Sequence, residues 1–140
     1  MVRINLIEPW RLADQHLVAE YDEILMLLGH CRKYPKSRKI PSSYCLGPGH
    51  ICFFKDKLLY LKKRHEELKR EMIRRGFKPT KDVNLRDFHR SLLNDWKPGE
   101  SDFKIIRKRL IERLKQKPGF YRYYGERKSL RFLIGLLANR

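Results

Sequence analysis

Residues 13–31 read ADQHLVAEYDEILMLLGHC, and this stretch decides the fold. Its apolar side chains recur at spacings of four, three and four, which places them along one stripe of a helix: Leu17, Tyr21, Ile24 and Leu28. Pro9 lies upstream as a break. The pattern therefore predicts an amphipathic helix from about Ala13 to about Cys31, with one face against a core.

Two further stretches have the same periodicity. A second helix is predicted from a stripe in which His65 fills the missing place: Phe54, Leu58, Leu61, Leu68 and Met72. Gly76 follows two arginines and Pro79 lies beyond it, which marks where this helix stops. A third helix is predicted from about Ser101 to Lys117, because a proline follows an apolar stripe: Ile106, Leu110 and Leu114.

The apolar run from Ser129 to Leu137 favours a fourth helix near the C-terminal end. Loops are expected at 32–44, at the turn-dense linker 46–50, and at 78–99, where mixed signals allow short irregular helix. No strand pattern of convincing length and no internal repeat is found. We therefore expect an all-α fold: one compact domain over residues 1–140, with three main helices, a C-terminal helix and long loops.

The charge of the chain points to its partner. Lys and Arg number 33 against 16 Asp and Glu, giving a formal net charge of +17. Such an excess needs a polyanionic partner or a tolerance for self-repulsion. Nucleic acid is the most economical partner, with an anionic membrane surface or ribosomal RNA as alternatives. The start, MVRINLIEPW, lacks the layout of a signal peptide, and the longest apolar stretch is too short to span a membrane. Three cysteines, an odd number, indicate reduced thiols in a cytosolic setting.

Five potential metal ligands fall within 23 positions: His30, Cys31, Cys45, His50 and Cys52. Their spacing lacks the paired C-x₂-C pattern of zinc modules, and Cys31 lies on the predicted first helix. We therefore expect no metal and no cofactor, and we assign His50 a structural place in the Gly-Pro-Gly-His turn.

Several blocks along the chain carry a resemblance to a known family. They are Arg3-Ile4-Asn5-Leu6, Leu12-Ala13-Asp14-Gln15-His16-Leu17, Ala19-Glu20-Tyr21, Glu23, Leu46-Gly47-Pro48-Gly49-His50, Phe53-Phe54, Asp56-Lys57-Leu58, Arg75-Gly76-Phe77, Arg109-Leu110, Lys117-Pro118 and Phe120-Tyr121-Arg122-Tyr123-Tyr124-Gly125. In this order the chain resembles the pyrimidine-dimer DNA glycosylases, the phage-type endonuclease V of ultraviolet repair. The blocks cover nearly the whole chain to Gly125, so residues 126–140 are an extension beyond the family core.

The resemblance implies a glycosylase that also cleaves the strand at abasic sites. The nucleophile would be the α-amine of Val2 after removal of Met1, attacking C1′ of the damaged nucleotide and forming an imine that permits β-elimination. An α-amine suits this chemistry because its pKa is near ~8, against ~10.4 for lysine. A neighbouring cation such as Arg3 would lower that pKa further.

Glu23 would be the acid/base partner of the amine. On a helix, His16, Glu20 and Glu23 lie at i, i+4 and i+7, on one polar face beside the apolar stripe. A carboxylate there could stabilise charge on the sugar and move protons during imine formation. The alternative is that these are solvated surface groups. His16 is the histidine assigned to function, because it shares a face with Glu23.

DNA contacts are expected from three groups of residues. Arg109, Arg113 and Lys117 recur at i, i+4 and i+8 and coincide with family positions that touch phosphates. The aromatic block 120–124 could stack bases and grip the DNA backbone, or it could pack to close the core. The resemblance suggests both, with Tyr121 and Arg122 as the expected outward part, and Gln15 is a further candidate. A basic loop cluster could contact phosphate or could simply be solvated: Lys33, Lys36, Arg38 and Lys39.

Three positions depart from the family pattern. Residue 2 is Val where the best-known members carry Thr, which leaves the α-amine unchanged and makes methionine removal less efficient. Asp22 and Met26 stand where the family typically has DNA-contacting arginines, which puts dimer preference in doubt. The like charge of Asp22 would also raise the pKa of adjacent Glu23.

Together these features predict a monomeric intracellular enzyme, located in the cytoplasm or nucleoid, that flips a nucleotide out of duplex DNA without a cofactor. The expected substrate is the cyclobutane pyrimidine dimer, with other damaged bases or abasic sites as alternatives. The departures motivate a competing interpretation, a non-catalytic DNA-binding protein on the same scaffold. A helix-turn-helix regulator is a third, although no short two-helix unit with a tight turn is evident.

Overall fold

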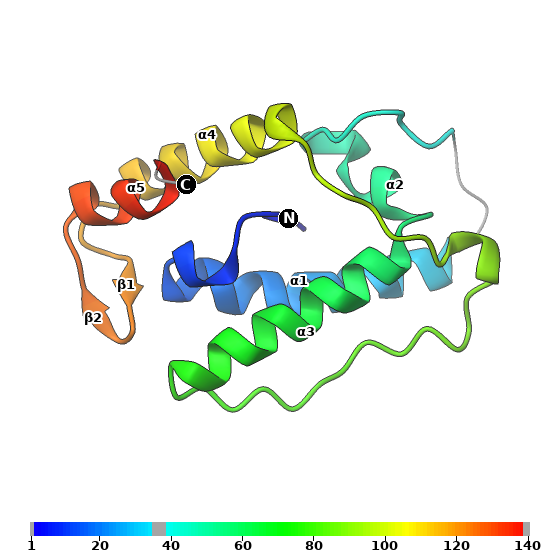
Figure 1. Ribbon diagram of the computed structural model, residues 1–140, viewed down its shortest axis with the longest axis horizontal. Helices are drawn as coiled ribbons and strands as arrows, with labels where there is room; N and C mark the ends of the chain where they lie inside the picture. The colour runs from blue at the N-terminus through cyan, green and yellow to red at the C-terminus, as the bar shows by residue number, and fades with distance from the viewer. Residues whose placement is uncertain (1, 35–38, 139–140) are drawn as a thin grey trace.

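The computed structural model describes residues 2–34 and 39–138, within which the chain forms five α-helices and one small β-hairpin (Figure 1). The expectation of an all-α fold is therefore confirmed. The helices are α1 (Asp14–Lys33), α2 (His50–Phe54), α3 (Leu58–Arg74), α4 (Glu100–Gln116) and α5 (Leu130–Ala138). Short 3₁₀ turns are η1 (Pro9–Arg11), η2 (Gly47–Gly49) and η3 (Arg90–Leu92), and the antiparallel hairpin joins β1 (Arg122–Tyr123) to β2 (Glu126–Arg127).

Helices α1, α4 and α5 lie within two residues of their predicted bounds, whereas the predicted second helix is wrong in one respect: it is two helices, α2 and α3. The break is at Lys57, whose φ of −127° and ψ of 41° are not helical. The Lys57 ammonium instead donates to the Phe53 carbonyl oxygen (2.9 Å) and the Asp56 carboxylate (2.8 Å). Because Phe54 and Leu58 are both fully buried, the apolar stripe continues across the break and conceals it from periodicity.

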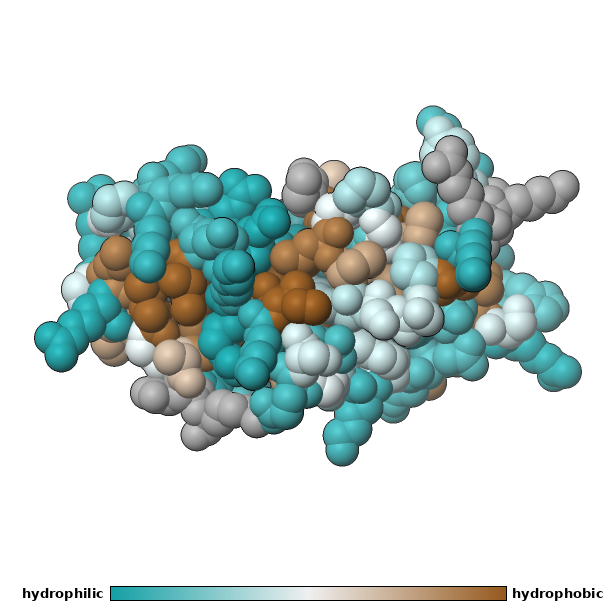
Figure 2. All heavy atoms as spheres, turned by 90° about the horizontal axis from the view of Figure 1, so that it is seen from above, coloured by the Kyte–Doolittle hydropathy of each residue, from teal (hydrophilic) through white to brown (hydrophobic). Residues whose placement is uncertain are grey.

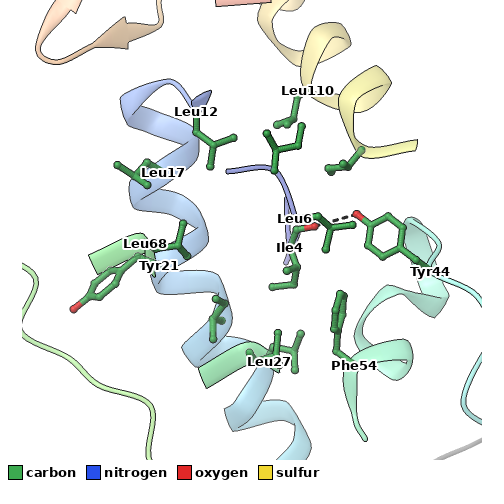
Figure 3. Packing of buried hydrophobic residues seen from close by; sticks show 14 of the residues in the cluster. Ile4, Leu6, Leu12, Leu17, Tyr21, Leu27, Tyr44, Phe54, Leu68 and Leu110 are labelled. Carbon is green, nitrogen blue, oxygen red and sulfur yellow. Dashed lines mark hydrogen bonds between the residues drawn. The ribbon is translucent and has the colours of Figure 1, made fainter. Parts of the chain in front are cut away.

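The N-terminal segment, residues 2–7, runs through the middle of the molecule between α1 and α4 (Figure 1). Figure 3 shows Ile4 and Leu6 among core side chains contributed by α1, α2 and α4. The chain turns at Leu6, which has a left-handed φ of 59°, and the Ile7 N–H donates to the Asn5 carbonyl oxygen at 2.5 Å. A left-handed leucine costs roughly 1–2 kcal/mol, and burial of the Leu6 side chain offsets that cost.

A buried ion pair joins α1 to α3. The Arg64 guanidinium donates two hydrogen bonds to the Glu20 carboxylate (2.7 and 2.9 Å), and both side chains are almost completely buried. The same guanidinium donates to the carbonyl oxygen of Ile7 at 2.6 Å. Arg64 therefore ties both helices to the end of the N-terminal segment.

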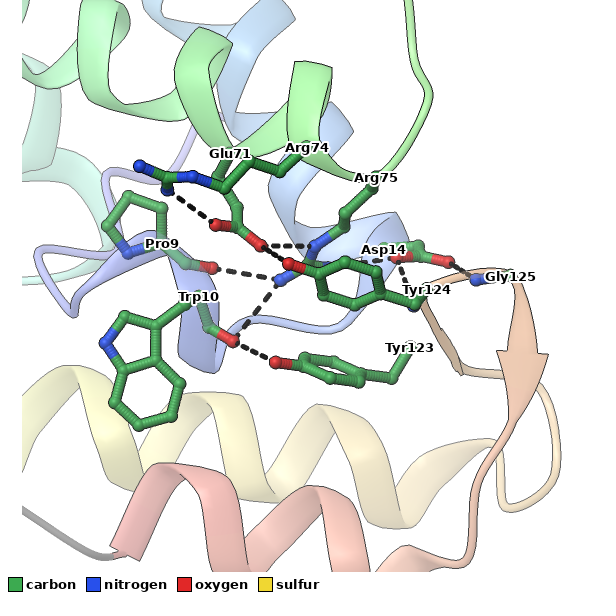
Figure 4. A network of polar contacts seen from close by, with 9 residues as sticks. All are labelled: Pro9, Trp10, Asp14, Glu71, Arg74, Arg75, Tyr123, Tyr124 and Gly125. Carbon is green, nitrogen blue, oxygen red and sulfur yellow. Dashed lines mark hydrogen bonds and ion pairs between the residues drawn. The ribbon is translucent and has the colours of Figure 1, made fainter.

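The β-hairpin is attached to the helices through Arg75, immediately after α3 (Figure 4). The Arg75 guanidinium donates to Asp14 and Glu71, each at 2.9 Å, and it lies over the rings of Tyr123 and Tyr124. Asp14 in turn accepts hydrogen bonds from the backbone N–H groups of Tyr124 and Gly125 (3.1 and 2.8 Å). This network fixes the aromatic block against the first turn of α1, a connection that periodicity did not reveal.

The remaining expectations for the described residues concern thiols, metal ligands and membrane spans. Cys31, Cys45 and Cys52 are free thiols. Across residues 2–34 and 39–138, no three or more His, Cys, Asp or Glu side chains gather closely enough to hold a metal ion. In the same part of the chain, no helix combines the length and the apolarity needed to cross a bilayer.

Replacing Arg64 with Ala should strongly destabilise the fold, because it leaves the Glu20 carboxylate buried without its partner. The expected loss in free energy of unfolding is about 3–5 kcal/mol, measured by urea denaturation. Lys63→Ala is the matched control, since the Lys63–Asp95 pair is exposed and should contribute about 1 kcal/mol or less. Equal losses in the two variants would contradict the assignment of Arg64 as the structural tie.

Candidate active site at the N-terminal segment

A carboxylate from α1 meets the backbone of the N-terminal segment. The Oε1 atom of Glu23 accepts a hydrogen bond from the backbone N–H of Arg3 at 2.7 Å. The side chain is half-buried and lies one helical turn after Glu20, whose pair with Arg64 anchors the same helix. Glu23 is therefore held one residue from the α-nitrogen of Val2.

The electrostatic surroundings of Glu23 favour its protonated form. Burial raises the pKa of Glu23, while the Arg3 N–H and guanidinium act in the opposite direction and Glu20 adds to the rise. The like charge that raises this pKa is thus supplied by Glu20, and the expectation that Asp22 would supply it is wrong. Asp22 is exposed to solvent, which screens its charge.

The next residue, Ile4, is held at both of its backbone polar groups. Its N–H donates to Nε2 of His50 at 2.8 Å, and its carbonyl oxygen accepts from the Tyr44 hydroxyl at 3.0 Å, the contact drawn in Figure 3. The Ile4 side chain has no exposed surface. The N-terminal segment is therefore fixed by hydrogen bonds from several separate elements.

Arginines from α4 approach the same place. Burial lowers the pKa of Arg3, Glu23 raises it, and the neighbouring cations Arg113 and Arg109 lower it. The like charges that lower the pKa of Arg3 would be compensated by an anion bound nearby. Guanidinium groups match phosphate geometry, so this cluster suits the backbone of a nucleic acid.

His16 borders the cluster in a buried, neutral state. Its pKa is lowered to about 3, mainly by burial and further by Arg3 and Arg113. The ring lies 4.7 Å from that of Tyr121, and its Nε2 atom has no hydrogen-bond partner within the described residues. His16 and Glu20 are 6% and 0% exposed, so the alternative of a solvated polar face is wrong for both.

A comparison with known proteins agrees with this geometry. The family model of pyrimidine dimer DNA glycosylases matches residues 1–85. The chain belongs to this family. It is a DNA-repair glycosylase, an enzyme whose substrate is DNA. The matched part contains Arg3, His16, Glu23 and His50, and it ends before the arginines of α4 and the aromatic block.

The structure brings only some of the glycosylase's expected DNA contacts to this site. Arg109 and Arg113 are half-buried on α4 and act on Arg3, whereas Lys117 lies beyond the last residue of α4 with non-helical backbone angles. The predicted helical stripe therefore holds for the first two residues and is wrong for Lys117. Figure 2 shows hydrophilic side chains over much of one face of the molecule, separated by smaller apolar areas.

In the aromatic block, Tyr121 is only 8% exposed, so the expectation that it faces outward is wrong. Its ring packs on His16, and Phe120 meets it edge-on at 5.1 Å. Arg122 is exposed, as expected. Gln15 donates to the Phe120 carbonyl oxygen (2.9 Å) and accepts from the Arg122 N–H (3.0 Å), so it holds this segment in place.

Among the described residues of the basic loop cluster, only Lys33 lies on a helix that also carries a site residue. Lys33 is the last residue of α1, ten residues after Glu23, or about 15 Å along a helix. Lys39 is exposed, whereas Lys36 and Arg38 are outside the described residues. Lys33 therefore lies about three helical turns from Glu23.

Sequence reasoning missed two kinds of residue in the site. Arg64 stands three residues after Leu61 and four before Leu68, inside an apolar stripe, and a charge there indicates a buried pair. The position of Arg64 in the stripe could therefore have indicated its burial. Tyr44 comes from an irregular loop, and nothing in its spacing indicated a bond to Ile4. His50 was expected to be structural, but its partner in the N-terminal segment was not foreseen.

His16 should remain uncharged where an ordinary histidine titrates. Because its folded pKa is about 3, its ring shifts in NMR spectra should stay constant between about pH 8 and about pH 5. The unfolded chain gains a proton near pH ~6.5, so the stability contributed by His16 should fall as the pH drops from there toward about 3.

Arg113→Gln removes one cation that lowers the pKa of His16 and should raise that pKa. Arg122→Gln, at an exposed position, is the control and should leave it unchanged. A wild-type titration curve for His16 centred near pH ~6.5 would refute the buried, neutral assignment.

Proposed function

We propose that this glycosylase attacks its substrate with the α-amine of Val2, exposed by removal of Met1, and that it also cleaves the strand as an abasic-site lyase. The observation that carries the proposal is the 2.7 Å hydrogen bond from the Arg3 N–H to Glu23. It holds a carboxyl group one residue from the proposed nucleophile, as acid/base catalysis on an amine requires.

The amine suits this role at neutral pH. A terminal α-amine has a pKa near ~8, so a useful fraction is unprotonated. The neighbouring Arg3 guanidinium would favour the neutral amine further, because it repels a second positive charge. Only the backbone nitrogen reacts, so Val at position 2 serves as well as Thr.

The proposed reaction has a glycosylase step followed by a lyase step. The amine nitrogen forms a bond to C1′ as the glycosidic bond breaks. The electron pair of the glycosidic bond leaves with the base. The amine then loses a proton, the sugar ring opens at its C1′–O4′ bond, and an imine results. Protonated, this imine acts as an electron sink. Loss of a proton from C2′ forms a C2′–C3′ double bond, and the 3′ phosphate leaves with the C3′–O electron pair.

Glu23 exchanges protons in these steps. Burial raises its pKa, so it gives up its proton less readily than an exposed glutamate. As an acid it can protonate the O4′ or base leaving group, and as a carboxylate it can stabilise positive charge on the sugar or accept a proton. Neutral His16, with its lowered pKa, is suited to packing or hydrogen bonding rather than to donating a proton as a cation.

The substrate fits the charge of the site. Arg3, Arg109 and Arg113 would hold phosphates flanking the lesion, and exposed Arg122 would extend this contact. We propose the cyclobutane pyrimidine dimer in duplex DNA as the lesion, flipped out of the helix before attack. The enzyme would act as a monomer, with residues 1–140 as one domain.

Borohydride trapping on duplex DNA carrying a dimer or an abasic site tests the nucleophile. Wild-type protein whose intact mass shows loss of Met1 should form a covalent adduct, and peptide mapping should place the DNA on Val2. Blocking the terminal amine should abolish the adduct. Correctly processed protein that binds this DNA and is never trapped would refute the amine mechanism.

Glu23→Gln tests the carboxyl group while preserving an acceptor for the Arg3 N–H. Strand cleavage should fall by at least about 10²-fold, with binding retained. Asp22→Asn is the matched control, because it removes an adjacent, exposed carboxylate, and it should cleave at close to the wild-type rate.

Arg109→Ala tests the phosphate contact from α4. Binding should weaken, and the slope of log K against log salt should fall by about one unit, measured by fluorescence anisotropy over a salt series. Lys62→Ala, an exposed cation on α3, should leave the slope unchanged. Equal effects of the two substitutions would mean that net charge alone, and no defined contact, accounts for binding.

A further inference from the structure

We propose that His50 is a positioning residue for this reaction: by accepting the Ile4 N–H, it sets the place of the N-terminal segment relative to Glu23. The inference rests on the proposed amine mechanism and extends it. It assigns a role in the reaction to a histidine on α2, far in sequence from both the proposed nucleophile and the carboxyl group.

The hydrogen bonds of His50 determine its tautomer. A backbone N–H can only donate, so the 2.8 Å contact between Ile4 N and Nε2 requires a bare, accepting Nε2. The ring proton therefore lies on Nδ1, where it is donated to the Cys45 carbonyl oxygen at 2.8 Å. His50 must be neutral to make both contacts, and burial lowers its pKa accordingly.

Two consecutive amides are thereby held by side chains from two different helices. Glu23 on α1 accepts from the Arg3 N–H, and His50 on α2 accepts from the Ile4 N–H. Tyr44 adds a third contact at the Ile4 carbonyl oxygen. The nitrogen of Val2 lies one residue before this clamp, so any shift of the Ile4 amide moves the proposed nucleophile relative to Glu23.

The His50 ring itself has little freedom. It is 2% exposed, and the rings of Tyr44 and Phe54 lie at 5.4 and 5.3 Å in edge-on contact. The charged groups that act on it are Glu20 from α1, which raises its pKa, and Arg3 from the N-terminal segment, which lowers it. Such an immobile acceptor can transmit a defined position to the backbone that it binds.

The chain offers a matched control in a second buried histidine. His65 is 1% exposed, and its Nε2 contacts the Tyr21 carbonyl oxygen at 3.1 Å. It shares the burial of His50 and its bond to a backbone group, but it binds α1 rather than the N-terminal segment. His65→Gln therefore reports the cost of removing a buried imidazole without releasing Ile4.

The experiment compares His50→Gln, His50→Ala and His65→Gln in the full chain. Unfolding by urea gives stability, anisotropy with duplex DNA carrying a non-cleavable abasic analogue gives Kd, and single-turnover borohydride trapping on an abasic duplex gives the reaction rate. Long-range ¹H–¹⁵N NMR spectra report the His50 tautomer, and amide spectra report the Ile4 N–H in each folded variant.

We expect His50→Ala to lower the trapping rate by about 10²-fold, because small misplacements of reacting groups have effects of that size, while Kd changes by less than about threefold. His50→Gln retains an acceptor and should recover most of the rate. His65→Gln should lose stability and keep the wild-type rate. If His50→Ala does not fold, the wild-type tautomer and the Ile4 N–H signal in folded His50→Gln remain decisive.

Several results would overturn the assignment. They are a protonated Nε2 in wild type, an unchanged trapping rate in folded His50→Ala, or a loss of trapping rate in His65→Gln as large as that in His50→Ala. A failure of the amine mechanism is distinguishable from these, because wild type itself would then form no adduct, although the tautomer and the Ile4 amide would still report the clamp.

Discussion

The backbone of a buried segment must find hydrogen-bond partners, and residues 2–7 find most of theirs in side chains, the bond from the Ile7 N–H to the Asn5 carbonyl oxygen being internal to the segment. No strand pairs with this segment within the described residues. Glu23, His50, Tyr44 and Arg64 satisfy its N–H and carbonyl groups instead. The rest of the fold follows from this constraint, because the helices and loops that supply these side chains must surround the N-terminal segment.

This arrangement gives a reason for the burial of so many polar groups. Glu20 and Arg64 are costly to bury as separate ions, and their pair is compensated by the bond from Arg64 to Ile7. The same burial raises the pKa of Glu23 and lowers those of His16 and His50. Burial around the N-terminal segment therefore has two effects. It holds the segment in place, and it shifts the pKa values of the side chains beside it.

Part of the fold and site could be predicted from sequence because it depends on local periodicity. The stripe of Leu17, Tyr21, Ile24 and Leu28 indicated α1 and its buried face, and the family pattern pointed to Glu23. Lys57 interrupts the second predicted helix without interrupting its stripe, so periodicity could not detect the break. The burial of Tyr121 was not predicted for a related reason: its sequence neighbours are exposed, and its ring packs on His16, which is more than 100 positions away.

The sequence by itself determined the helical class, the excess of positive charge and the membership of a DNA glycosylase family, since each is carried by composition or by residues in order. Only the tertiary structure decided that the charges of Arg109 and Arg113 act on Arg3, that Glu23 accepts from the Arg3 amide, and that His50 accepts from the Ile4 amide. These contacts join residues 20 to more than 100 positions apart. Their formation depends on how the helices pack, which no local pattern specifies.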